Sequence, residues 1–108
     1  MENKIQAQMR KGILDFLVLG ILKEKGETYG AEIIEILKNS DLIVVEGTVY
    51  PLLSRLKKEN LIDYRWEESE SGHPRKYFKL TKTGENAYIL MSSSWLEIKN
   101  TVEKILKM

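Results

Sequence analysis

The sequence predicts a mainly helical α+β fold in which a β-hairpin separates three helices from a long final helix. Apolar residues recur with helical spacing over roughly the first 60 residues, alternate with polar residues from 62 to 67, and return to helical spacing after 82. Three helices, a hairpin and a last helix in this order make the winged helix-turn-helix pattern. The long last helix adds a candidate dimerisation element to that fold.

The composition excludes several classes of protein. At 108 residues, 43% hydrophobic and 31% charged, the chain predicts one globular unit. No apolar run approaches the roughly 20 residues needed to span a bilayer, so we expect a cytoplasmic protein without a membrane partner. The absence of cysteine and the single histidine, His73, exclude disulfides and clustered thiolate or histidine metal sites, and no cofactor is expected. The net charge of +1 means that a nucleic-acid role depends on where the charges lie.

Residues 5 to 25 are predicted to form the first helix. Its apolar stripe is made by Ile13, Phe16, Leu17 and Ile21, and four further apolar residues widen it around the cylinder: Leu14, Val18, Leu19 and Leu22. A helix that is apolar on most sides must be covered on most sides. A second copy of the chain is the natural candidate to cover one of them, and Gly20 would allow a neighbouring helix to approach closely.

The second helix is predicted over residues 29 to 39, with Thr28 as its N-cap. Residues 39 to 41 have turn chemistry. The β-branched run at residues 42 to 45 is either a brief strand or an apolar linker into the next helix.

The central helix, starting at Glu46 or Gly47, is the strongest local signal. Its buried stripe has the spacing i, i+3, i+4 and i+7: Val49, Leu52, Leu53 and Leu56. Its other side carries hydroxyls and cations: Thr48, Tyr50, Ser54, Arg55, Lys57 and Lys58. Asn60 follows, where a left-handed cap is expected. A helix anchored on one face and cationic on the other suits the major groove of DNA, although an ordinary surface helix has the same pattern.

Two strands follow, over residues 62 to 67 and 75 to 80, joined by a polar loop. Ile62, Tyr64 and Trp66 alternate with charged residues, which predicts a half-buried strand, and Phe78 and Leu80 are the inward candidates of the second. Residues 72 to 82 contain four cations and no acid. We therefore expect the hairpin to be a wing that reaches the DNA backbone through its Gly72 to Lys76 side.

The last helix is predicted over residues 82 to 107, with Thr81 as N-cap. Apolar residues step along it by three and four, and we call them the seam residues: Tyr88, Met91, Trp95, Ile98, Val102 and Ile105. This is the a/d pattern of helix association. We expect residues 81–108 to be a dimerisation helix attached to a DNA-binding domain at residues 1–80, in one compact unit. The alternative is that the helix folds back onto its own first helix.

Several short motifs together resemble the PadR family of bacterial transcriptional regulators. They are Tyr29-Gly30, the run GTVYPLLSRL at 47 to 56, Leu61-Ile62, the run GHPRKYFKLT at 72 to 81, and Gly84. The resemblance covers nearly the whole chain and implies a homodimeric repressor, with two winged helices held by the first and last helices. The single short C-terminal helix is similar to that of the compact branch of the family. Asn60 stands where the family usually has glycine, and asparagine tolerates the left-handed conformation.

The candidate DNA-binding residues come from the central helix and the wing. Thr48, Tyr50 and Ser54 would donate hydroxyls to phosphate or base edges, and Arg55 and Lys58 would bind phosphate. His73, Arg75 and Lys76 would position the wing on the backbone or minor groove. For Tyr50 a half-core role is the alternative, for Arg55 an intramolecular ion pair, and for the wing a solvated charge run. A dimer would place its central helices about 34 Å apart, on an inverted-repeat operator.

Trp95 is the candidate effector residue, because a dimer would bring two indoles close to its two-fold axis. Relatives of the compact branch suggest a cavity there in which a small flat aromatic effector stacks. A tryptophan that only fills the dimer seam is the alternative.

The other class considered is a winged-helix module that binds protein and not DNA. An enzyme is not expected, since the sequence offers no activated nucleophile, metal cluster or glycine-rich phosphate loop.

Overall fold

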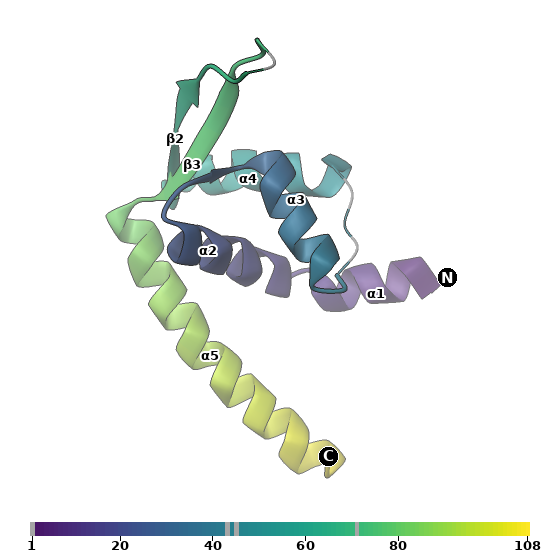
Figure 1. The fold of residues 1–108 in the computed structure, drawn as a ribbon. Helices are drawn as coiled ribbons and strands as arrows, with labels where there is room; N and C mark the ends of the chain where they lie inside the picture. Colours follow the sequence, from purple (N-terminus) through teal and green to yellow (C-terminus); the bar gives the residue numbers. More distant parts are fainter. Residues whose placement is uncertain (1, 43, 45, 71) are drawn as a thin grey trace.

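The computed structural model describes residues 2–42, 44, 46–70 and 72–108, with side chains from Lys4 onward. Over these residues it has the predicted fold class, helical with a small antiparallel sheet and a long last helix. The elements are α1 (Glu2–Arg10), α2 (Ile13–Lys25), β1 (Thr28–Tyr29), α3 (Gly30–Asn39), α4 (Glu46–Lys58), β2 (Ile62–Glu67), β3 (Arg75–Leu80) and α5 (Lys82–Leu106). Figure 1 shows α2, α3 and α4 grouped together, with the β2–β3 hairpin rising from them and α5 leading away.

The first helix is two helices, so the single helix predicted for residues 5 to 25 was wrong. α1 ends at Arg10 and α2 begins at Ile13. Glycine is a poor helix former because it loses more backbone entropy than alanine, and Gly12 stands at the break as the N-cap of α2. No helix of the described chain is both long enough and apolar enough to cross a membrane.

A two-residue strand, β1, was not predicted. It pairs antiparallel with β3, with Thr28 opposite Phe78, so the sheet order is β1-β3-β2. The prediction of Thr28 as the N-cap of α3 was therefore wrong, because Tyr29 takes that position. The Thr28 hydroxyl still donates to the Glu32 carboxylate one turn into the helix.

The core lies between α2, α3, α4 and the base of the sheet. Among the described residues it contains twelve buried hydrophobic side chains: Leu14, Val18, Leu19, Leu22, Ile33, Leu37, Val49, Leu52, Leu53, Leu56, Ile62 and Phe78. Gly20 allows α5 to approach α2, since a Cβ there would lie 3.3 Å from the Tyr88 ring. Of the run at 42 to 45, Ile43 and Val45 lie outside the described residues, while Leu42 and Val44 pack against the core without forming a strand.

The wing, residues 62 to 80, extends beyond this core. Ile62 is fully buried, but Tyr64 is 36% and Trp66 60% exposed. The prediction that one face of β2 is buried was therefore wrong beyond Ile62. The side chains do alternate between the two faces, with Tyr64 opposite Phe78 and Trp66 opposite Lys76, but the strand extends past the end of the core.

α5 divides the seam residues into two groups. Tyr88 and Met91 pack against the chain's own core, and the Tyr88 ring stacks on Phe16 of α2 with centroids 5.7 Å apart. The remaining seam residues are exposed: Trp95, Ile98, Val102 and Ile105. The first part of the helix thus packs on the core of the first domain, and the seam residues beyond Met91 are open to solvent.

One junction ties α4, β3 and α5 together. Asn60 adopts the predicted left-handed conformation, with φ 63°. The Thr81 hydroxyl donates to the Asn60 carbonyl at 2.7 Å, and the Thr81 amide donates to the Leu61 carbonyl at 3.1 Å. Thr81 also accepts from the Gly84 amide at 3.0 Å, which confirms it as the N-cap of α5. A Cβ on Gly84 would collide with the Leu61 carbonyl oxygen.

This packing predicts that Gly84→Ala destabilises the protein by about 2 kcal/mol, because the methyl group meets backbone that cannot turn away. Urea unfolding at a fixed protein concentration measures the change. Gly47→Ala is the matched control: a Cβ at Gly47 meets open space, and alanine favours the helix. Equal stabilities for the two variants would contradict the proposed role of Gly84.

Candidate functional site

A groove runs between α4 and the wing, with a volume of about 630 Å³. We call it the α4–wing groove. It is lined by Tyr29, Gly30, Ala31, Tyr50, Leu53, Ser54, Lys57, Tyr64, Pro74, Arg75, Lys76 and Phe78. Its charged lining residues are Lys57, Arg75 and Lys76, and among the described lining residues none is acidic. The groove is therefore suited to an anionic partner.

Tyr50 forms the α4 wall of this groove. Its side chain is 43% exposed and its ring lies against Gly30 at the start of α3, where a Cβ would collide with it. Both sequence interpretations of Tyr50 therefore meet in one place, a ring packed on one side and open on the other. Thr48, Ser54 and Lys58 are exposed along the same helix.

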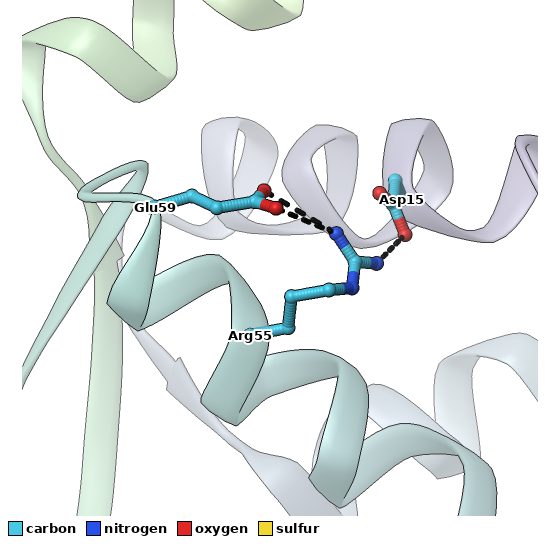
Figure 2. Close-up of polar contacts among 3 residues, drawn as sticks. All are labelled: Asp15, Arg55 and Glu59. Atoms are coloured by element: carbon cyan, nitrogen blue, oxygen red, sulfur yellow. Dashed lines mark hydrogen bonds and ion pairs between the residues drawn. The ribbon is translucent and has the colours of Figure 1, made fainter.

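Arg55 is not among the lining residues of the groove. Two acids, Asp15 and Glu59, hold its guanidinium (Figure 2). Its Nη2 lies 2.6 Å from Asp15 Oδ1 of α2, and its Nη1 lies 3.3 Å from Glu59 Oε1. These two carboxylates raise the pKa of Arg55, the Asp15 hydrogen bond most. The intramolecular pair was the alternative interpretation of this residue. A phosphate would have to displace these partners to bind Arg55.

The two neighbouring lysines of α4 differ in their surroundings. Lys57 Nζ lies 3.8 Å from Asp63 Oδ1, a loose and exposed pair. Lys58 has no ion pair with any described residue. Lys57 lines the groove and was not among the predicted site residues, because its place beside the wing depends on how the hairpin packs.

The cations of the wing lie over aromatic rings. The Arg75 guanidinium lies 4.4 Å from the Tyr29 ring centroid. Lys76 Nζ lies 4.4 Å from the Tyr64 centroid and 5.2 Å from that of Trp66. Such contacts are attractive because the ring face is electron-rich. Arg75 is exposed and Lys76 is partly exposed. His73 is exposed beside them, and its carbonyl accepts from the Ser69 hydroxyl at 2.6 Å.

The other face of the wing is anchored through Arg65. Its guanidinium forms two hydrogen bonds with Glu27, at 2.7 and 2.9 Å, and an ion pair with Glu67 at 3.1 Å. The hydrogen bond from Arg65 lowers the pKa of Glu27, and Glu27 and Glu67 raise that of Arg65. Two-point Arg–carboxylate contacts fix orientation as well as distance. The pair therefore ties β2 to the connection between α2 and β1.

A second, smaller hollow lies where the end of α1 and the start of α2 face α5, with a volume of about 270 Å³. It is lined mainly by apolar side chains: Met9, Gly12, Ile13, Phe16, Met91, Ser94, Trp95 and Ile98. Three of the predicted seam residues, including the candidate effector residue Trp95, thus line one hollow within a single chain. Within the described residues, no group of three or more histidine, aspartate or glutamate side chains is arranged to hold a metal ion.

Comparisons with known proteins agree with this architecture. The model of the transcriptional regulator PadR-like family matches residues 18–89. A PadR-like transcription factor from Bacteroides fragilis is 47% identical, and the match covers 94% of this chain and 98% of that one with a TM-score of 0.78. A PadR-like transcriptional regulator from Bacillus cereus is 35% identical over 94% of this chain and 98% of that one, with a TM-score of 0.81.

One similar structure was solved with DNA. It is Bacillus subtilis PadR in complex with operator DNA, 26% identical to this chain, with a TM-score of 0.66. The match covers 78% of this chain and 45% of that protein.

Proposed function

Since the chain belongs to the transcriptional regulator PadR-like family, we propose that it acts as a homodimeric repressor on an inverted-repeat DNA operator. Membership makes it a winged helix-turn-helix regulator of transcription, and not an enzyme. The main support for a DNA interface is the α4–wing groove, because its described charged lining residues are all cations. The operator complex of the Bacillus subtilis protein supports the same partner here.

In this proposal α4 enters the major groove and the wing follows the adjacent backbone. Ser54 and Lys58 are exposed on α4 and would meet base edges or phosphates, with Tyr50 at the groove wall. Thr48 is exposed on the side of α4 that carries Arg55 and would meet a phosphate there. Arg75 and Lys76 would neutralise phosphates at the wing, and His73 would help to position the wing on the backbone or minor groove. Arg55 would contact a phosphate only if it left Asp15 or Glu59, so we expect it to contribute less to DNA affinity than the other cations.

We propose that the outer part of α5 forms the dimer contact. In this proposal residues 1–80 bind DNA and residues 81–108 hold the two copies together. Support comes from the four exposed seam residues, Trp95, Ile98, Val102 and Ile105, on a helix that extends away from the domain. Apolar side chains in this number are stabilised when a second helix covers them. Two domains held this way would present their α4 helices to successive major grooves, about 34 Å apart.

We propose a small flat aromatic compound as the effector, bound against Trp95. The hollow between α2 and α5 supports this, because its lining is largely apolar and joins the body of the domain to the dimer helix. A ligand that favoured a different α2–α5 geometry would change the spacing of the two α4 helices and release DNA. The cytoplasm, where the chromosome of a bacterium lies, is the proposed location.

Arg75→Ala should weaken binding to specific and random duplex DNA alike and reduce the slope of log affinity against log salt by about 1. The reason is the loss of one phosphate contact without loss of a base contact. Electrophoretic shifts at four salt concentrations measure both quantities.

Lys104→Ala, which removes the same charge from the far end of α5, is the control and should leave both unchanged. A wild-type chain that shifts no DNA at low salt would instead favour the protein-binding module.

Ile98→Glu should convert the dimer to a monomer, because it buries a charge in the proposed contact while Ile98 is 53% exposed in the single chain. Light scattering after size exclusion, at several protein concentrations, gives the mass. Asn100→Glu adds the same charge on the polar side of α5 and should stay dimeric. A wild-type mass of one chain at all concentrations would end the dimer proposal.

Planar aromatic compounds should quench tryptophan emission in Trp66→Phe, where Trp95 is the remaining tryptophan of the two in the chain. The same compounds should lower the affinity of the wild type for DNA. If none quenches Trp95 and none changes DNA affinity, Trp95 only fills the contact between helices.

A further inference from the structure

One face of the wing carries aromatic rings from the core almost to the loop. The pairing of β2 with β3 places Tyr64 opposite Phe78 and Trp66 opposite Lys76 on this face. The Tyr64 ring lies 5.9 Å from Phe78 and 6.2 Å from Trp66, centroid to centroid. Exposure rises along the series, from 6% at Phe78 to 36% at Tyr64 and 60% at Trp66. We call Tyr64 and Trp66 the wing aromatic pair.

Core packing does not explain the wing aromatic pair. Phe78 and Ile62 already close the core at the base of the hairpin. An exposed indole on an edge strand keeps a large apolar surface in water, and such surfaces commonly mark a contact with a partner.

The charges around the pair indicate the chemistry of that partner. Tyr64 lines the α4–wing groove together with Lys57, Arg75 and Lys76. Lys76 Nζ lies over both rings of the pair, so a cation and two apolar ring faces are presented together. A sugar–phosphate strand has the matching features, a negative phosphate beside the apolar face of a deoxyribose.

Two acids limit how such a strand can lie. Glu67 and Glu68 border Trp66 on its outer side, together with Pro74. Glu67 is paired with Arg65, which reduces its repulsion of phosphate. A phosphate would therefore lie nearer Lys76 and Arg75 than these acids, and a sugar would lie on the rings.

We propose that Tyr64 and Trp66 are DNA-contact residues, which pack against the deoxyribose of one strand while Lys76 binds its phosphate. The inference rests on the proposed DNA-binding function and adds to it a contact that carries no charge. Because no counterion is released by an apolar contact, its contribution does not depend on salt. That property separates it from the cationic contacts of the wing.

The test uses the full chain and a 24-base-pair duplex of random sequence, since a sugar contact does not require the operator. Trp66→Ala should weaken binding roughly tenfold, because it removes a large apolar contact surface, with the salt slope unchanged. Trp66→Phe keeps an apolar ring and should stay within about twofold of wild type. Lys76→Met keeps a side chain over the rings but should lower the slope by about 1.

Fluorine NMR of protein labelled with 5-fluorotryptophan tests the contact without removing the indole. The Trp66 resonance, identified by its absence in Trp66→Phe, should shift when the duplex is added. Thermal unfolding and the oligomeric mass of each variant are measured alongside, and both should match wild type.

Distinct outcomes separate the two proposals. If the wild type binds the duplex while Trp66→Ala binds equally well, or its salt slope changes as that of Lys76→Met does, the aromatic contact is overturned and DNA binding stands. A Trp66 resonance whose chemical shift does not change when the duplex is added overturns it as well. A fall in affinity that accompanies a lower oligomeric mass would instead assign Trp66 to a contact between copies. Failure of the wild type to bind any duplex would overturn the proposed function itself.

Discussion

The contact between the Gly84 backbone and the Leu61 carbonyl determines how the functional parts are arranged. The end of α4, the end of β3 and the start of α5 meet there, and Thr81 hydrogen-bonds to Asn60, Leu61 and Gly84 within a few ångström. Because the space holds no side chain on residue 84, the three elements approach more closely than any other residue would allow. The end of α4, the end of β3 and the start of α5 are thus held together at one point.

The charge distribution explains how a chain with a net charge of +1 presents a cationic groove. Arg55 and Arg65 are each paired with two carboxylates, and neither these arginines nor their partners line the groove. Exposed pairs of this kind contribute little to stability. Their effect here is to place acids beside structural arginines. Arg75 and Lys76 lie over aromatic rings instead, and neither has an ion pair with a described carboxylate.

Local chemistry was enough to predict most of the fold. The stripe of α4, the left-handed Asn60 and the Thr81 cap each depend on a few adjacent residues, and the structure contains all three. The features that were missed depend on distant ones. β1 is a strand only because β3 lies beside it, the Asp15 partner of Arg55 lies 40 positions away, and the exposure of Trp66 depends on where the core ends. For the same reason Lys57, Tyr29 and Tyr64 were absent from the predicted site.

The 25 residues of α5 make a rod about 37 Å long, clamped to the domain only near its base. Such a rod works as a lever: a tilt of about 6° at the base displaces the tip by roughly 4 Å, given that length. If the tip is held instead, the same tilt of about 6° there displaces the whole domain by roughly 4 Å. A tilt of a few degrees far from the nucleic acid is then sufficient to shift the domain along the helical repeat that it contacts.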